Sequence, residues 1–179
     1  IAFCPGWDRA LVTTYMVTFG VIRSCISGFT VGTLCFQNKN SASFMLGVCD
    51  IFQTFPSFVY LIPVMMLFGI TDTSVLIAVI VYATIPATRY TIEGLRSVPT
   101  ALHDAATMSG VTKIQRLFKI EFPLAFPHMM LGLNQTIVFA LFMVIIGAFI
   151  GTEDLGQDIL KALSDKKGAG IGLTLGICV

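Results

Sequence analysis

Residues 104–123, DAATMSGVTKIQRLFKIEFP, form the most polar long segment of a chain that is otherwise mostly apolar, and they lie between two apolar blocks. The segment begins with the triplet Asp-Ala-Ala, and three residues separate this triplet from the first glycine. Nine more separate that glycine from an isoleucine, and a proline ends the segment. The positions that define this spacing are Asp104, Ala105, Ala106, Gly110, Ile120 and Pro123.

Each of these residue types suits a pair of short helices. We expect Asp104 near a helix start, where a carboxylate interacts favourably with the helix dipole, and Ala105 and Ala106 leave room for another backbone to approach. Gly110 permits a sharp bend between two helices. Pro123 ends the second helix or begins the next one, because it cannot donate an interior helix hydrogen bond.

The second half of the segment has the pattern of an amphipathic helix. At about 100° per residue, residues 111–122 place apolar and basic side chains on opposite faces. The apolar face holds Val111, Ile114, Leu117 and Phe118, and the basic face holds Lys113, Arg116 and Lys119. Such a helix docks onto another protein or lies on anionic lipid headgroups. Periodicity alone leaves both open.

Composition identifies the class of protein. Of 179 residues, 55% are hydrophobic and 12% are charged, and the mean hydropathy is +0.86, whereas a soluble domain carries about 25% charged residues. We therefore expect an integral membrane protein. The net charge of +1 gives no sign of nucleic-acid binding. Five scattered cysteines predict neither disulfides nor a metal site. The chain begins at Ile1 and ends within an apolar run, so we read it as part of a longer protein.

Apolar runs predict four complete membrane crossings and the start of a fifth, because about 20 such residues span a bilayer. The third run is short unless its helix continues past Arg89. We expect a polar loop at 37–43 and a short interfacial helix at 151–168. The predicted crossings are 10–36, 51–70, 75–88, 129–150 and 169–179.

Small residues recur every four positions in two of these runs, which lets helices pack closely in lipid. They are Ser24, Gly28 and Gly32 in the first run, and Gly147 and Gly151 at the end of the fourth.

Polar residues and prolines within the runs are candidates for lining a transport pathway. Arg23 either lines it, pairs with an acid such as Asp50, or extends its charge to the interface. Pro56 and Pro63 predict a broken, cavity-lining helix or a plain kink. Side chains in the fourth run either contact a solute or bond between helices. The full set is Arg23, Gln53, Pro56, Tyr60, Pro63, Asn134 and Gln135.

The basic residues favour one orientation. Six of them, Lys39, Arg89, Arg96, Lys113, Arg116 and Lys119, fall on the side that holds the 104–123 segment, and four, Arg9, Lys161, Lys166 and Lys167, fall on the other. The positive-inside rule therefore places that segment in the cytoplasm.

No sequence feature predicts catalysis. A Gly-x-x-x-x-Gly-Lys-Ser/Thr loop is absent, so the sequence has no such loop to hold the phosphates of ATP, and energy for any driven process would have to come from elsewhere. His103 and His128 are 25 positions apart with no nucleophile motif, and His103 is better explained as a capping or interfacial residue.

The segment resembles the cytoplasmic loop signature of ABC importer permeases: Glu-Ala-Ala, three residues, Gly, nine residues, Ile, any residue, Leu, Pro. Here Asp104 replaces Glu and Phe122 replaces Leu. Within that family the chain is most similar to glycine betaine and proline betaine permeases. The matching stretches are Gln53-Thr54, FVYLIP at 58–63, MLFG at 66–69, GLNQT at 132–136 and LGQ at 155–157.

This resemblance implies an all-α, polytopic membrane helix bundle of the type I ABC importer permease kind. It would have about five core helices in one domain over 1–179, incomplete at both ends, with a coupling loop at about 97–123. The implied ATPase-coupling residues are Asp104, Ala105, Ala106, Gly110, Ile120 and Pro123. We expect a multi-pass location in a bacterial or archaeal inner membrane.

The implied partners are ABC ATPase subunits that hold ATP and Mg²⁺, a solute-binding protein or fused receptor domain, and a second permease copy. This chain itself would bind no cofactor. The implied solute is glycine betaine, proline betaine or a related quaternary ammonium compound. Permeases for choline, carnitine or an amino acid remain alternatives. An ion-coupled carrier, which usually places an ionisable group at mid-membrane, is a further one.

Overall fold

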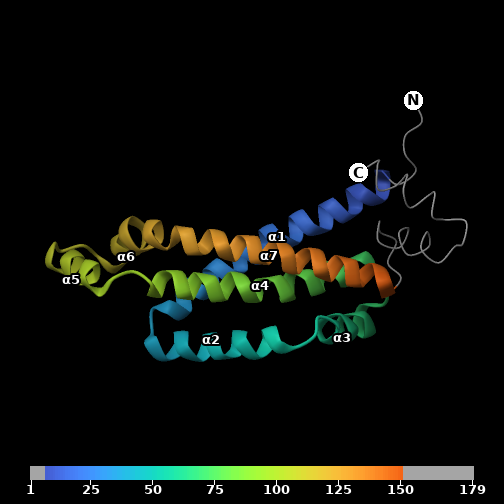
Figure 1. Ribbon diagram of the computed structural model, residues 1–179, viewed down its shortest axis with the longest axis horizontal. Helices are drawn as coiled ribbons and strands as arrows, with labels where there is room; N and C mark the ends of the chain where they lie inside the picture. Colours follow the sequence, from blue (N-terminus) through green and yellow to red (C-terminus); the bar gives the residue numbers. More distant parts are fainter. Residues whose placement is uncertain (1–6, 151–179) are drawn as a thin grey trace, which may run out of the picture. The chain divides into compact units, whose positions relative to one another are not determined.

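The computed structural model describes residues 7–150, with side chains from residue 11 onward, and every regular element in this part of the chain is helical (Figure 1). The elements are α1 (Trp7–Phe36), α2 (Lys39–Thr54), α3 (Phe58–Phe68), α4 (Asp72–Arg96), α5 (Thr100–Met108), α6 (Lys113–Arg116), the π-helix η1 (Leu117–Glu121) and α7 (Phe122–Ile150). The predicted all-α class is confirmed. The predictions for 151–168, 169–179 and Gly151 lie outside the described residues.

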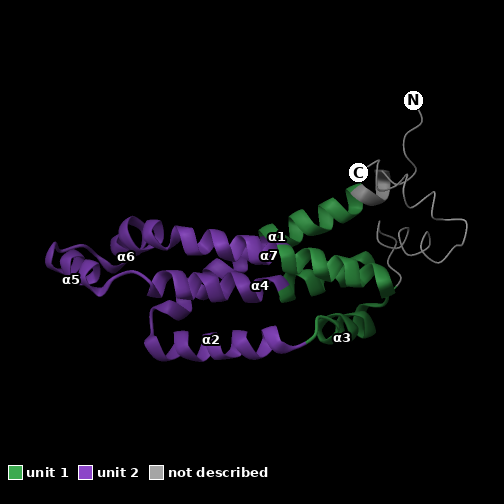
Figure 2. Cartoon of the chain, in the orientation of Figure 1, with its two compact units in different colours: residues 1–22, 56–82, 138–179 green, residues 23–55, 83–137 purple. Residues whose placement is uncertain are grey.

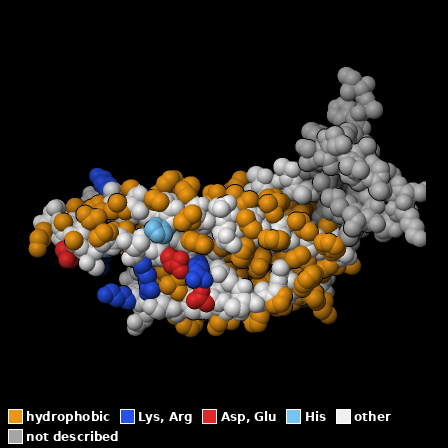
Figure 3. Space-filling model, viewed as in Figure 1, with side chains coloured by type: hydrophobic (Ala, Val, Ile, Leu, Met, Phe, Trp, Pro, Cys, Tyr) orange, Lys and Arg blue, Asp and Glu red, His pale blue; other side chains and the backbone are white. Residues whose placement is uncertain are grey.

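The chain forms two compact units, coloured separately in Figure 2. Unit 1 comprises 1–22, 56–82 and 138–179, and unit 2 comprises 23–55 and 83–137. The charged side chains visible in Figure 3 gather over unit 2. A single permease domain over the whole chain stays a prediction.

Three helical stretches are long and apolar enough to cross a membrane: Leu11–Phe36, Asp72–Arg96 and Lys113–Ile150. The first is a continuous helix over the run predicted at 10–36. The second shows that the third apolar run continues past Arg89. The third begins well before residue 129, because helix already extends from Lys113 without interruption into α7.

The run at 51–70 is a broken helix, as its prolines predict, and whether it lines a cavity stays a prediction. Its residues belong to a broken pair, α2 and α3, that together could make a fourth, interrupted span. Pro56 lies in the break, and Phe55 before it is extended (φ −72°, ψ 136°), as expected for a residue preceding proline. Pro63 lies inside α3. The loop predicted at 37–43 is wrong, since α2 begins at Lys39.

Within unit 2, α1 packs closely on α4. A methyl group added at Gly28 would lie 2.4 Å from the Cβ of Ala87, and one at Gly32 would lie 2.7 Å from the Cβ of Thr91. This confirms the predicted close-packing role of the glycine spacing. A second part of the core joins α4 to α7 through Leu95, Ala125 and Met129, with Phe29, Phe36, Leu117 and Phe122 packed around them.

Unit 1 has a core of its own. A methyl group at Gly147 would lie 2.7 Å from Val75, which again confirms close packing. The ring of Tyr82 contacts two others, with centroids 5.0 Å from Tyr60 and 4.8 Å from Phe139. Leu61 on α3 is fully buried.

Candidate coupling site and pathway residues

The bend predicted at Gly110 is present. Gly110 has φ +71°, a conformation that glycine adopts without a steric penalty. The N–H of Gly110 donates to the carbonyl of Thr107 over 3.1 Å, and the N–H of Val111 donates to that of Ala106 over 3.3 Å. These bonds satisfy carbonyls at the end of α5 and turn the chain toward α6. We call α5, the turn and α6 the coupling hairpin.

The second arm of the coupling hairpin begins with a capping box. The Thr112 side chain accepts from the N–H of Gln115 over 3.4 Å, and the Gln115 side chain accepts from the N–H of Thr112 over 3.1 Å. Two helix-end donors are thereby satisfied, which defines where α6 starts.

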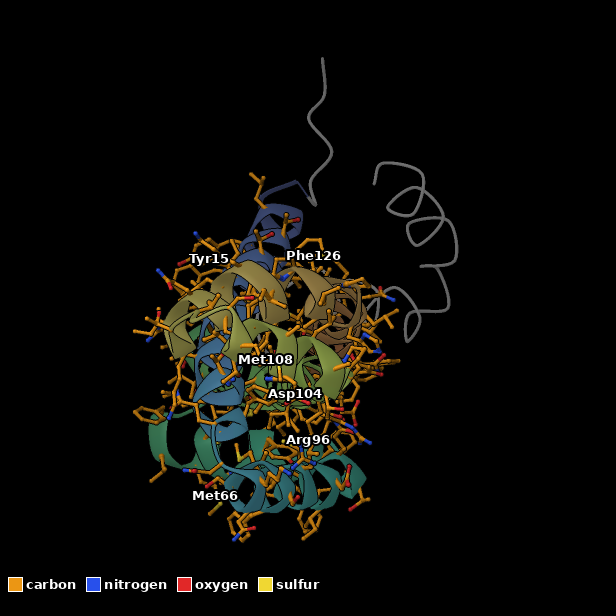
Figure 4. All side chains as sticks on the ribbon, turned by 90° about the vertical axis from the view of Figure 1, so that its left-hand side faces the viewer. Tyr15, Met66, Arg96, Asp104, Met108 and Phe126 are labelled. Atoms are coloured by element: carbon orange, nitrogen blue, oxygen red, sulfur yellow. The ribbon has the colours of Figure 1, made fainter. Side chains whose placement is uncertain are left out.

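Asp104 is not near a helix start, so that prediction is wrong. Helix α5 begins at Thr100, directly after Pro99, and Asp104 is its fifth residue. Pro99 is the N-cap and has a non-helical ψ of 136°, so the helix begins directly after it. Asp104 and Ala105 are exposed, while Ala106 is buried (Figure 4 labels Asp104 and Met108).

The amphipathic face predicted over 111–122 is only partly buried. Leu117 packs into the core of unit 2. Exposed fractions are high for Met108 at 90%, Ile114 at 71% and Phe118 at 65%. Helix begins at Lys113 and becomes a π-helix at Leu117–Glu121, so an α-helical period does not describe this segment. Pro123 is the second residue of α7, which confirms that it begins the next helix.

Three apolar side chains thus define an exposed patch on and beside the coupling hairpin, formed by Met108, Ile114 and Phe118. Lys113 and Lys119 beside them are also exposed. Exposed apolar side chains with lysines next to them in the chain suit a protein surface with an apolar recess and acidic groups nearby.

Glu121 is the residue that the sequence analysis missed. Its side chain is 3% exposed, and its Oε1 lies 2.8 Å from Nε of Arg116 and 3.2 Å from Nδ1 of His103. His103 therefore connects α5 with η1. Arg116 faces Glu121 instead of joining an exposed basic face. The only sequence signal was an acid five residues after an arginine, a spacing that α-helical periodicity does not bring together.

A second ionic group joins α2 to α4. Arg89 pairs with Asp50 and with Glu93, whose Oε1 is 3.0 Å from Nε, and it donates to Oε1 of Gln53 over 3.1 Å. The suggested pairing of Arg23 with Asp50 is wrong: Asp50 pairs with Arg89, and Arg23 is exposed.

The remaining pathway candidates stay predictions. Gln53 contacts Arg89, and Tyr60 contacts Tyr82. Asn134 is exposed and Gln135 is half-buried, both on α7.

Arg96 lies beside the start of α2, while the predicted orientation in the membrane stays a prediction. Its Nη2 donates to the carbonyl of Lys39 over 3.1 Å and to Oγ of Ser43 over 2.9 Å. Two of the cations assigned to one membrane side therefore lie together at the junction of α2 and α4.

Comparison with known proteins gives relatives of one kind. The chain is 88% identical over all 179 residues to the trimethylamine N-oxide transport system permease protein TmoV of Pelagibacter ubique, and 46% identical to that of Ruegeria pomeroyi. It is 35% identical to the glycine betaine transport system permease protein OpuAB of Bacillus subtilis. The chain covers 25%, 27% and 63% of these proteins, respectively.

Solved structures support the same fold. An inward-facing conformation of the MetNI methionine ABC transporter contains a chain that matches with a TM-score of 0.80 at 20% identity, covering 95% of this chain and 85% of that one. The family model for binding-protein-dependent transport system inner membrane components matches residues 25–179. The chain therefore belongs to this family, the permeases of ABC importers, and shares their type I fold and membrane setting.

Proposed function

We propose that this chain is the solute-conducting part of an ATP-driven importer and that the coupling hairpin docks onto an ABC ATPase. The observation that carries the proposal is the exposed patch of Met108, Ile114 and Phe118 within the Asp104-to-Pro123 signature. If the coupling hairpin lies outside the bilayer, these apolar side chains are exposed to water, and docking would bury them. The segment Lys113–Ile150 has 38 residues, which is about 57 Å of helix, more than the roughly 30 Å of a hydrocarbon core. This difference means that part of the segment lies outside the hydrocarbon core, and the polar residues at its start make that end the part we place there.

The proposed solute is a small compound with a methylated nitrogen head. The relative at 88% identity is named for trimethylamine N-oxide, and relatives at 35% and 36% are named for glycine betaine or proline betaine. Trimethylamine N-oxide and glycine betaine each carry a trimethylated nitrogen and a negatively charged oxygen group. We place trimethylamine N-oxide first because of the higher identity, and keep glycine betaine as the alternative.

The proposed importer contains further parts: two ATPase subunits that hold ATP and Mg²⁺, a solute receptor and a second permease copy. ATP would bind more tightly when the ATPases are closed, so closure would draw the coupling hairpins together and favour one orientation of the pore. Only such differential binding lets a ligand shift a conformational equilibrium.

Uptake measurements test the importer. Cells that lack their own systems would carry the full-length gene with its neighbouring ATPase and receptor genes, and would be given labelled trimethylamine N-oxide or glycine betaine. A second strain would carry an ATPase without its phosphate-loop lysine. Uptake lost in the second strain supports the proposal, and the better-transported label identifies the solute. Uptake that persists there points to an ion-coupled carrier. No uptake of either compound by an assembled complex contradicts the proposed solute class.

Variants at Gly110 test the coupling hairpin. Gly110→Pro cannot adopt a φ of +71°, so the protein should insert while ATP hydrolysis no longer drives uptake. Gly110→Asn is the matched control, because asparagine tolerates this region better than other residues. Normal uptake by the proline variant would contradict the docking proposal.

A further inference from the structure

We propose that Glu121 is a positioning residue: its buried carboxylate fixes the coupling hairpin to the start of α7 and thereby determines how much solute is moved per ATP hydrolysed. The first half of this statement rests on the geometry, and the second half also rests on the proposed function.

One oxygen atom makes both connections. Oε1 of Glu121 lies 2.8 Å from Nε of Arg116 on α6 and 3.2 Å from Nδ1 of His103 on α5. The two arms of the coupling hairpin are therefore joined to the same carboxylate of η1. A displacement of either arm would lengthen one of these contacts.

Because the Glu121 carboxylate is buried, it needs partners within the protein. The Glu121 side chain is 3% exposed, whereas Arg116 and His103 are partly exposed. A buried carboxylate has lost its hydration and requires partners. The hairpin position that supplies both partners is thus favoured over positions that leave the acid alone.

The π-helix explains how Arg116 reaches Glu121. In an α-helix, residues five apart are about 140° from each other around the axis. The wider turn of a π-helix, with its i→i+5 hydrogen bonds, brings such residues toward one face. Leu117–Glu121 has this geometry. Arg116 directly precedes this π-helix, and Glu121 is its last residue.

Helix α5 has little else that holds it. Of its nine residues only Ala106 is buried. Leu102 and Met108 are among its exposed apolar side chains. With so little apolar burial, the contact between His103 and Glu121 carries an unusually large share of the positional restraint on this arm.

The first test measures the position of the coupling hairpin directly. In the full-length complex, in a cysteine-free background, spin labels would replace two exposed residues outside the docking patch, Ala101 on α5 and Leu124 on α7. We expect Glu121→Gln and His103→Leu to broaden the distance distribution between the labels. His103→Gln should keep it narrow, because its amide can still donate to the carboxylate. Should Glu121→Gln fail to assemble, the two His103 variants decide the question alone.

The second test measures ATP hydrolysed per solute imported, in vesicles with the reconstituted complex. We expect Glu121→Gln to raise this ratio by about threefold or more, in the range of coupling changes caused by residues that touch neither ligand. The matched control is Asp72→Asn, an exposed carboxylate at the start of α4, which should keep the wild-type ratio. A purely structural loss would reduce the amount of complex and leave the ratio unchanged.

The two readouts separate the possible failures. An unaltered distance distribution in Glu121→Gln and His103→Leu overturns the positioning role, whether or not the complex transports. An altered distribution with an unchanged ratio overturns the coupling role. A wild-type complex without ATP-driven uptake contradicts the proposed function, while the distance measurement still decides the positioning role.

Discussion

Two helices of unit 2 attach to α4 in opposite ways. Helix α1 approaches through small residues: Gly28 and Gly32 lie against Ala87 and Thr91, and Oγ of Ser27 is 3.0 Å from Oγ1 of Thr84. Helix α2 attaches through polar contacts made by two arginines of α4, Arg89 and Arg96, with Asp50, Gln53, Ser43 and the backbone of Lys39. Only Ala42 and Cys49 of α2 are buried.

The difference shows that two kinds of stabilisation serve one scaffold. Close backbone approach gains dispersion contacts that do not depend on solvent, and it fails abruptly when volume is added. Ionic contacts between partly exposed groups are weaker and are screened by salt. We therefore expect α2 to separate from α4 more readily than α1 does. Two buried cysteines serve as reporters: Cys49 on α2 lies near Arg89 and Glu93 of α4, whereas Cys25 on α1, one turn before Gly28, contacts Thr136 of α7 and responds to movement of α1.

The largest effect is expected from adding one carbon to the close interface. In Gly28→Ala the new methyl would lie 2.4 Å from the Cβ of Ala87 and 3.0 Å from the backbone N of Thr88, neither of which can rotate away. We expect a loss of about 2 kcal/mol, measured as a lower apparent melting temperature of the full-length complex, and faster modification of Cys25 by N-ethylmaleimide.

The matched control is Gly47→Ala on α2, where a methyl would meet nothing within 4 Å. This variant should gain up to about 1 kcal/mol from helix propensity. Equal melting temperatures for the two alanine variants would show that α1 and α4 are not in close contact.

A smaller effect is expected at the polar interface. Arg89→Met keeps most of the apolar stem but removes the contacts to Asp50 and Gln53. Because Asp50 is exposed, we expect a loss of about 1 kcal/mol or less and a several-fold faster modification of Cys49. Modification of Cys25 serves as the internal control and should stay at the wild-type rate. Faster reaction of both cysteines would mean that the two interfaces are not independent.

Salt should also speed the modification of Cys49, but by less than Arg89→Met does. Raising the ionic strength to 1 M shortens the screening length to about 3 Å, so Cys49 of the wild-type chain should react faster by about twofold or less. In Arg89→Met this dependence should disappear. A salt response that persists in the variant would show that other charges hold α2.

The smallest effect is expected for Arg96→Gln. Arg96 and its partner Ser43 are exposed, and a surface contact of this kind contributes about 0.5 kcal/mol or less. Cys49 should react at nearly the wild-type rate. If Cys49 in Arg96→Gln reacted as fast as in Arg89→Met, the contacts of Arg96 with the start of α2 would be the main attachment of this helix.

Much of the fold follows from the sequence because its signals are local or periodic. The long apolar runs, the glycine spacing and the bend at Gly110 each depend on residues close together in the chain. The positions of helix ends were harder to predict. Pro99 starts α5 four residues before the signature, so Asp104 lies in mid-helix. Pro56 and Pro63 predicted the broken run at 51–70, but not that α2 already begins at Lys39.

The ionic groups could not be predicted for a different reason. Asp50 had more than one cation that could reach it, and only the packing of α2 on α4 selects Arg89 over Arg23. Glu121 was overlooked because its contact with Arg116 depends on a π-helix, and its contact with His103 depends on how the coupling hairpin folds back. Neither geometry has a period that a sequence pattern reveals.

The π-helix also affects how this chain tolerates changes in length. A π turn holds one residue more than the α turn it replaces, so deleting one exposed residue there, such as Lys119, can be absorbed by reverting to α-helix. The arginine and the glutamate would then be four residues apart, a spacing at which opposite charges also meet. Deletion of one residue from α4 before Arg89 would instead rotate every later side chain of that helix by about 100°. Arg89 and Arg96 would then point away from α2. Of the two segments, only the π-helix can lose one residue, in a natural or a designed variant, without loss of its contacts.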